Sequence, residues 1–153
     1  MEKLVGRVQE KRILENALVS PGAELIAVYG RRRVGKTFLI RSVYEKHLVF
    51  EFTGVHDAKM QAQLESFSFA LKKAIASPVD LAVPASWVAA FHLLENFLTP
   101  LVKKQKTVIF FDEFPWIHTK KSSFLTAFEH FWNSLIPNVI TCLHNPAILH
   151  KAL

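Results

Sequence analysis

Residues 30–37, which read GRRRVGKT, restrict how this chain can fold more than any other stretch. They follow a short apolar run, LIAVY (25–29), and precede a segment whose apolar residues recur at helical spacing. An apolar run without alternation is typical of a strand covered on both faces. Gly30 and Gly35 allow the backbone to turn with its N–H groups pointing inward, and the following helix adds its positive N-terminal end. The stretch therefore predicts an anion-binding turn between a buried strand and a helix.

The same residues fit the pattern Gly-x-x-x-x-Gly-Lys-Ser/Thr, in which each fixed position has a role toward nucleotide phosphates. Lys36 can reach the β and γ phosphates, and the hydroxyl of Thr37 can hold Mg²⁺. A simple glycine turn would explain Gly30 but not the Gly-Lys-Thr run. We therefore expect ATP and Mg²⁺ as cofactors, Lys36 as a catalytic residue and Thr37 as a metal ligand. The predicted nucleotide-binding positions are Gly30, Arg31, Arg32, Arg33, Val34, Gly35, Lys36, Thr37 and Phe38.

Three consecutive arginines, Arg31, Arg32 and Arg33, lie inside this turn. In a phosphate-binding turn the backbone faces the ligand and the intervening side chains mostly point outward. We expect the arginine side chains to add positive field at the mouth of the site and to face solvent or a neighbouring subunit. An alternative is that one of them acts on the γ-phosphate bound by a neighbouring subunit.

Two acids close a second apolar run, VIFFDE (108–113). Ligands of open α/β sheets bind at the carboxyl ends of the strands, so a strand parallel and adjacent to the first would place Asp112 beside the phosphate turn. Asp112 is then a predicted metal ligand, and Glu113 a predicted general base for an attacking water. Acids after a strand can also simply cap the next helix. A glutamate after the aspartate is missing from many nucleotide kinases and GTPases, which favours water as the acceptor.

The remaining pattern alternates strands with helices, which indicates an α/β domain with a parallel sheet wrapped by helices in three layers. Residues 1–153 show no internal repeat and no second domain. Pro100 is expected to bend its helix or end it early, and two prolines predict a loop over 77–86. The predicted strands are 25–29, 48–52, 108–111 and 139–142, and the predicted helices 8–19, 37–46, 58–76, 87–104 and 123–135.

Composition places the chain among globular proteins rather than exported or membrane proteins. Half of the 153 residues are hydrophobic, and the formal net charge is +6. The start has no signal-peptide core, and no apolar stretch approaches the roughly 18 residues that span a bilayer. The single cysteine, Cys142, fits a reducing compartment and is expected to be a small buried residue. We expect a cytoplasmic protein without membrane contact.

Other potential ligand-binding residues carry weaker signals. The seven histidines show no spacing to cysteines or acids that predicts a zinc site. Short lysine clusters at 103–106 and 120–121 could contact DNA, but such clusters are more often solvated. We therefore expect solvated lysines rather than a nucleic-acid surface.

Taken together, these motifs resemble the N-terminal part of an archaeal-type ATPase, a family within the AAA+-like P-loop ATPases. The resemblance covers about 4–135 and rests on LVGRVQEKRILENAL (4–18), VYGRRRVGKTFLIR (28–41), FFDEFPWI (110–117) and KSSFLTAFEHFWN (121–133). It implies ATP binding with slow hydrolysis, in proteins that often act as regulatory switches or oligomeric machines. It also implies that Gly6 and Arg7 lie near the adenine.

Beyond Leu135 the chain departs from that family's pattern. Members usually continue with a strand ending in a polar sensor residue, further core elements, an arginine that acts on the γ-phosphate, and a C-terminal domain. His144 or Asn145 could take the sensor position. We expect an incomplete domain in which strand 25–29 is an exposed sheet edge that favours self-association. The alternative to slow ATP hydrolysis is a nucleotide-binding module without turnover, either a regulatory adaptor or a truncated remnant.

Overall fold

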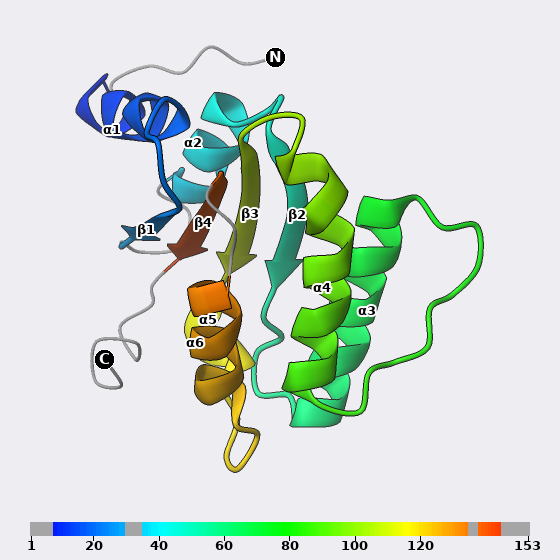
Figure 1. The fold of residues 1–153 in the computed structure, drawn as a ribbon. Helices are drawn as coiled ribbons and strands as arrows, with labels where there is room; N and C mark the ends of the chain where they lie inside the picture. The colour runs from blue at the N-terminus through cyan, green and yellow to red at the C-terminus, as the bar shows by residue number, and fades with distance from the viewer. Residues whose placement is uncertain (1–7, 30–34, 135–137, 145–153) are drawn as a thin grey trace.

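Four parallel strands form the sheet at the centre of the computed structural model, which describes residues 8–29, 35–134 and 138–144. The strand order is β1-β4-β3-β2 (Figure 1). All three pairings are parallel. The strands are β1 (Glu24–Val28), β2 (Leu48–Thr53), β3 (Thr107–Asp112) and β4 (Val139–His144). The four strands expected from apolar runs are thus present, each within about two residues of its predicted limits.

The helices also follow the predicted segments, with one addition. They are α1 (Val8–Leu18), α2 (Lys36–Val43), α3 (Met60–Ile75), α4 (Trp87–Val102), α5 (Phe114–Ile117) and α6 (Phe124–Ser134). Ser86 caps α4, since its hydroxyl accepts a hydrogen bond from the N–H of Ala89 at 3.1 Å. Pro100 lies inside α4, and the helix ends two residues later at Val102. The sequence did not predict α5, which is a single turn directly after the two acids.

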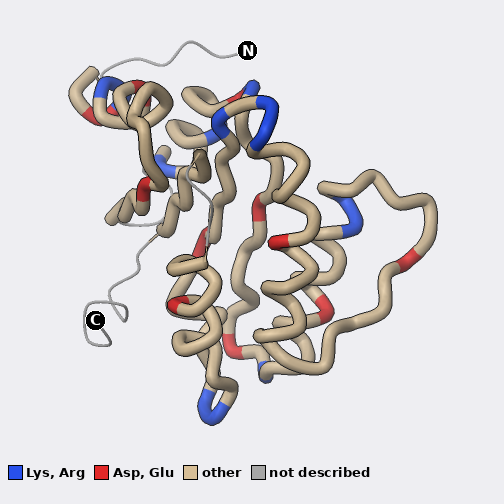
Figure 2. The backbone as a smooth tube through the Cα atoms, in the orientation of Figure 1, with Lys and Arg blue, Asp and Glu red and all other residues tan. Residues whose placement is uncertain are grey.

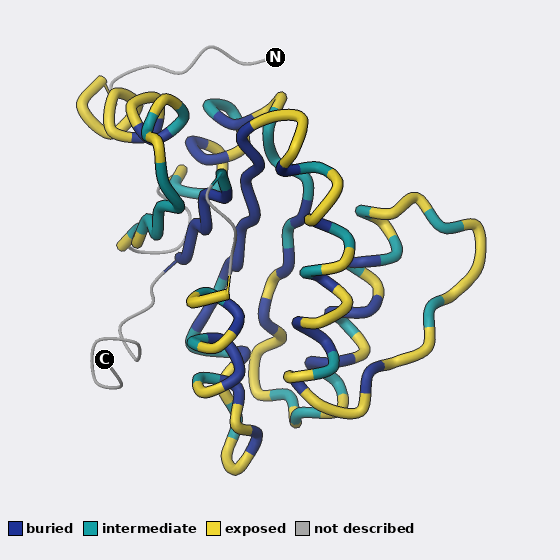
Figure 3. The backbone as a smooth tube through the Cα atoms, in the orientation of Figure 1, coloured by how far each residue is buried: buried dark blue, intermediate teal, exposed yellow. Residues whose placement is uncertain are grey.

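Helices cover both faces of the sheet, as the three-layer prediction requires (Figure 1). On one face, α1 and α2 pack through Leu14, Leu39 and Ile40 against β3 and β4. On the other face, α3, α4 and α6 bury a cluster rich in phenylalanine. Every residue of β3 and β4 is buried, whereas β1 and β2 are partly exposed (Figure 3). Burial on both faces explains why β3 and β4 read as continuous apolar runs.

The order of the strands differs from the sequence prediction in one respect. We expected the strand that ends in Asp112 to lie next to β1, but β4 lies between them. Val28 pairs with His144, and Phe111 pairs with Leu143. The prediction was wrong because local sequence does not specify which strands become neighbours. As a consequence, the C-terminal end of β4 lies between the ends of β1 and β3.

β1 is one of the two outer strands of the described sheet, and its single neighbour there is β4. Four of its residues are partly buried and one is exposed, in contrast to the fully buried β4. An apolar outer strand offers backbone groups for pairing with another chain. Self-association through β1 remains a prediction. Within the described parts of the chain, no helix combines the length and apolar character needed to cross a membrane.

Basic residues, lysine and arginine together, occur in several separate segments of the described chain (Figure 2). Lys103 and Lys104 are exposed, as expected for solvated residues. Lys106 is different, because it is only 7% exposed. Its ammonium group donates hydrogen bonds to the carbonyl oxygens of Ser20 and Gly22, both at 2.7 Å. The expectation of a solvated lysine is wrong at this position, where the side chain fastens the turn before β1 to the start of β3.

Replacing Lys106 with methionine should therefore destabilise the domain. The change removes two charge-assisted hydrogen bonds and leaves two carbonyl groups without this partner, so we expect a loss of about 2–4 kcal/mol in the free energy of unfolding. Urea denaturation measures it. Lys103→Met is the matched control, with an expected change within about 0.5 kcal/mol. Equal stabilities of the two variants would show that the buried hydrogen bonds of Lys106 contribute nothing to the free energy of unfolding.

Candidate functional site

The N-terminus of α2 opens toward the carboxyl ends of the strands. Gly35 precedes the helix with φ 81° and ψ 15°, a left-handed conformation that glycine adopts without steric cost. Its position has no capping side chain. The first turn of the helix therefore presents backbone N–H groups and a positive dipole end, which suits an anion. Lys36 and Thr37 are partly buried in this turn, and Phe38 is exposed.

Seven of the predicted binding residues lie outside the described residues. These are Gly6, Arg7, Gly30, Arg31, Arg32, Arg33 and Val34. Their roles toward phosphate, adenine or a neighbouring subunit remain predictions.

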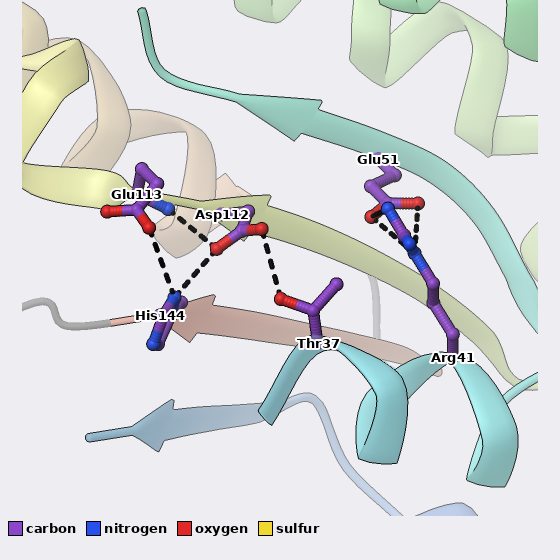
Figure 4. Close-up of polar contacts among 6 residues, drawn as sticks. All are labelled: Thr37, Arg41, Glu51, Asp112, Glu113 and His144. Carbon is purple, nitrogen blue, oxygen red and sulfur yellow. Dashed lines mark hydrogen bonds and ion pairs between the residues drawn. The ribbon is translucent and has the colours of Figure 1, made fainter. Parts of the chain in front are cut away.

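A hydrogen bond joins the start of α2 to the end of β3 (Figure 4). The hydroxyl of Thr37 donates to Oδ2 of Asp112 at 3.1 Å, although the two residues are 75 positions apart in the chain. The structure thus brings together the two residues that the sequence assigned to metal binding. Thr37 is in the helix that follows β1 and Asp112 ends β3, and β4 lies between these two strands.

Asp112 is the centre of the polar contacts at this edge. It is 9% exposed, and its Oδ1 accepts hydrogen bonds from the N–H of Glu113 at 2.9 Å and from His144 Nδ1 at 2.7 Å. Burial by itself would raise the pKa of Asp112. The hydrogen bonds from His144, Thr37 and the Glu113 N–H outweigh burial, so the pKa is lowered. Asp112 is therefore a carboxylate at neutral pH.

His144 ends β4 and faces both acids (Figure 4). Its Nδ1 lies 2.7 Å from Asp112 Oδ1 and 3.9 Å from Glu113 Oε1. The hydrogen bond with Asp112 raises the pKa of His144, against the effects of burial and of the Lys36 charge. His144 was one of two residues considered for a sensor position, and the other, Asn145, lies outside the described residues. Sequence spacing did not associate His144 with the acids, because 32 residues separate it from Asp112.

Glu113 has an unusual backbone conformation. With φ 51° and ψ 50° it is in the left-handed region, and it stands at the N-cap position of α5. Glutamate rarely adopts this conformation, which often marks functional sites. Its carbonyl accepts a hydrogen bond from the N–H of Trp116 at 3.0 Å. The turn leaves the Glu113 carboxylate beside His144, at the same edge as Asp112 (Figure 4).

Gly54, just after β2, packs directly behind this turn. A Cβ added at Gly54 would lie 2.6 Å from the carbonyl oxygen of Glu113 and 2.9 Å from Cγ1 of Ile117. Its N–H donates to the carbonyl of Asp112 at 3.0 Å. Only a residue without a side chain allows this approach. Sequence reasoning did not single out Gly54, although a glycine directly after a strand is a recognisable signal.

Gln63 of α3 is a second positioning residue that the sequence did not reveal. Its side chain is buried, and its Nε2 donates to the carbonyls of Val55 at 2.7 Å and Trp116 at 2.9 Å. Its Oε1 accepts from the N–H of Val55 at 2.9 Å. One side chain therefore ties the loop after β2 to the short helix that follows Glu113. A single glutamine on an amphipathic helix carries no signal of this role.

An ion pair holds the other end of α2. The guanidinium of Arg41 donates to the carboxylate of Glu51 on β2 through Nε at 2.8 Å and Nη2 at 2.6 Å (Figure 4). Hydrogen bonding to Glu51 raises the pKa of Arg41. The pair is largely exposed, so its contribution to stability is small. It adds a contact between α2 and the outer strand β2.

An all-parallel sheet flanked by helices, with a Gly-Lys-Thr helix start joined to an acid at the end of a buried strand, is the arrangement of a P-loop nucleoside triphosphatase domain. Residues 4–143 match the family model described as an ATPase domain predominantly from Archaea, and the chain belongs to that family. The resemblance found in the sequence is thereby confirmed. Membership indicates nucleotide binding and ATPase activity in general. A comparison with curated proteins found no match.

The family match also corrects one sequence interpretation. We placed the end of the resemblance at Leu135, but the match extends to residue 143. It therefore includes most of β4, whose last residue, His144, contacts Asp112. The apolar run at 139–142 is short and gives only a weak strand signal, so the sequence did not indicate that the match to the family continues through β4.

Proposed function

We propose that this domain binds ATP with Mg²⁺ at the start of α2 and hydrolyses it slowly. The proposal is supported mainly by the 3.1 Å hydrogen bond between Thr37 and Asp112, which unites the phosphate-binding motif with the acid of β3. Lys36, the first residue of α2, acts on the β and γ phosphates. Backbone N–H groups of the first turn of α2 bind the phosphates.

The two oxygen groups joined by this bond suit Mg²⁺. Magnesium prefers oxygen ligands and keeps several waters, so a hydroxyl, one carboxylate and phosphate oxygens are sufficient. Asp112 is held as a carboxylate by its hydrogen bonds, and Thr37 is already directed toward it. Bound Mg²⁺ would neutralise charge on the β and γ phosphates. The protein holds the Thr37 hydroxyl and the Asp112 carboxylate beside the N-terminus of α2.

Glu113 is the proposed general base. It directly follows the metal-binding acid, and its left-handed turn directs the carboxylate to the edge of the sheet where the phosphates would lie. Its side chain is 12% exposed, so few solvent waters compete for it. From this position it accepts the proton of a water that attacks the γ-phosphate.

The alternative function, a nucleotide-binding module without turnover, is favoured by one contact. His144 lies 3.9 Å from Glu113 Oε1 and 2.7 Å from Asp112 Oδ1. A protonated His144 would neutralise much of the charge that a base needs. The two functions therefore make the same prediction for ATP binding and opposite predictions for phosphate release.

The test of the proposed function measures ATP binding and phosphate release together on the purified chain. Lys36→Ala should abolish detectable binding, because the ammonium group that neutralises the phosphates is lost. Lys46→Ala, at an exposed lysine just after α2, is the control and should bind like the parent. Binding by Lys36→Ala equal to that of the parent would refute the site. Binding by the parent without phosphate release would support the alternative function.

A further inference from the structure

Asp112, Glu113 and His144 form a cluster whose ligand atoms all lie within 4.8 Å of one another. We propose that these three side chains directly bind a divalent first-row transition metal, such as Mn²⁺, Co²⁺ or Zn²⁺, in the nucleotide-free domain. Binding releases to solvent the proton that His144 Nδ1 donates to Asp112 Oδ1, because a ligating imidazole nitrogen must be deprotonated. This site shares Asp112 with the Mg²⁺ position proposed between Thr37 and the phosphates but differs from it in using Glu113 and His144. Metal binding at this cluster does not depend on ATP turnover.

The spacing of the three ligand atoms carries the proposal. Nitrogen and oxygen ligands lie about 2.0–2.2 Å from such a metal, so ligands that share it lie roughly 3–3.5 Å apart. His144 Nδ1 is 2.7 Å from Asp112 Oδ1 and 3.9 Å from Glu113 Oε1. One distance is slightly short and the other slightly long. The third pair of ligand atoms, on the carboxylates of Asp112 and Glu113, lies within 4.8 Å. Rotation of the side chains is therefore needed to bring all three atoms to one ion.

The ligand types determine which metals the site takes. An imidazole nitrogen suits Zn²⁺ and similar first-row transition metals, and carboxylates suit Mn²⁺, whereas Mg²⁺ is usually bound through oxygen. Two carboxylates and one histidine also provide two negative charges for a doubly charged ion. The histidine therefore changes a pair of acids that would suit magnesium into a set that favours transition metals.

The surrounding structure already orients each ligand. His144 is only 4% exposed, and its Nε2 has no hydrogen-bond partner among the described residues, so its polar contacts are made by Nδ1. Thr37 bonds to Oδ2 of Asp112 and leaves Oδ1 facing the imidazole (Figure 4). The left-handed turn of Glu113 directs its carboxylate to the same point. The hydrogen bond from Thr37 to Asp112 is a contact of the kind that fixes the orientation of a metal ligand.

Occupancy of this site has one consequence that rests on the proposed function. A metal ligated by Glu113 and Asp112 withdraws both the base and the magnesium ligand. Transition metals should therefore inhibit phosphate release. Metal binding itself is measured without nucleotide, so failure of the metal site and failure of the ATPase proposal are distinguishable.

The experiment uses the full chain after removal of bound metal with a chelator. Addition of Co²⁺ should produce visible d–d absorption, and Mn²⁺ bound to the protein should show ¹⁴N couplings in pulsed electron paramagnetic resonance. Replacing His144 with asparagine should remove the nitrogen couplings and weaken Co²⁺ binding by at least about tenfold, since even supporting residues of metal sites contribute about 10–100-fold. Weak binding of Mg²⁺ to the nucleotide-free chain should be the same in the His144→Asn variant as in the parent.

A matched variant separates this site from adventitious binding by other histidines. His92→Asn, at an exposed histidine on α4, should bind Co²⁺ like the parent. Glu113→Gln provides a second test, because it should weaken Co²⁺ binding while retaining the nitrogen couplings. Far-ultraviolet circular dichroism confirms that each variant is folded. Equal Co²⁺ affinity of the parent and folded His144→Asn, or nitrogen couplings that persist in that variant, would overturn the proposal.

Discussion

Replacing Glu113 with glutamine is expected to leave ATP binding intact and to lower the rate of phosphate release by about 10²–10⁴-fold, the usual contribution of a positioned general base. Glutamine has nearly the same shape, so the turn before α5 and the contact with Gly54 are kept. It cannot accept a proton from water at neutral pH. Equilibrium binding of a fluorescent ATP analogue and a phosphate-release assay measure the two effects separately.

Glu45→Gln is the matched control for charge removal, since Glu45 is exposed and lies between the end of α2 and the start of β2, not at the carboxyl end of a strand. It should leave both binding and release unchanged. Phosphate release by Glu113→Gln at the parental rate would show that another group, or none, acts as the base. A parent without measurable release would instead support the nucleotide-binding module.

Gly54→Ala should have the second large effect, on both stability and phosphate release. The new Cβ would lie 2.6 Å from the Glu113 carbonyl and 3.0 Å from the N–H nitrogen of Ile117, and both are backbone atoms that cannot rotate away. Overpacking of this kind costs about 1–3 kcal/mol. Because the strain is relieved by moving the Glu113 turn, turnover should fall by roughly tenfold or more, since small displacements of catalytic groups are costly.

Gly22→Ala provides the comparison, because a Cβ at Gly22 meets no atom within 4 Å. Its expected effect is within about 0.5 kcal/mol, with unchanged phosphate release. Thermal denaturation and the same phosphate assay apply to both variants. If the two alanine variants behave alike, the close approach of Gly54 does not position Glu113.

Local patterns predicted the elements of this fold well. In the part of the chain that the structure describes, apolar runs identified all four strands, and helical spacing identified five of the six helices. The exception, α5, has only four residues, which is too short for a periodic pattern. The sequence motifs also indicated that Thr37 and Asp112 lie near each other, and the structure places them in hydrogen-bond contact. Metal binding by this pair remains a prediction.

Contacts between distant segments were not predictable in the same way. Lys106 belongs to a lysine cluster that looks solvated, yet two carbonyl groups of another loop surround its ammonium group. Gln63 looks like one polar residue of an amphipathic helix, yet it joins two loops. Each of these two side chains contacts residues that are distant in the sequence. No local sequence pattern specifies which distant residues those are.

The sequence by itself determined the class of this protein, a parallel α/β domain of the archaeal ATPase family that carries a Gly-x-x-x-x-Gly-Lys-Thr motif and two acids after an apolar run. Strand and helix periodicity, glycine turns and acids at strand ends act within a few residues, so they can be read locally. Only the tertiary structure decided the strand order, in which β4 separates β1 from β3 and delivers His144 to Asp112 and Glu113. Strand order depends on how whole apolar faces pack together, and no local pattern records that outcome.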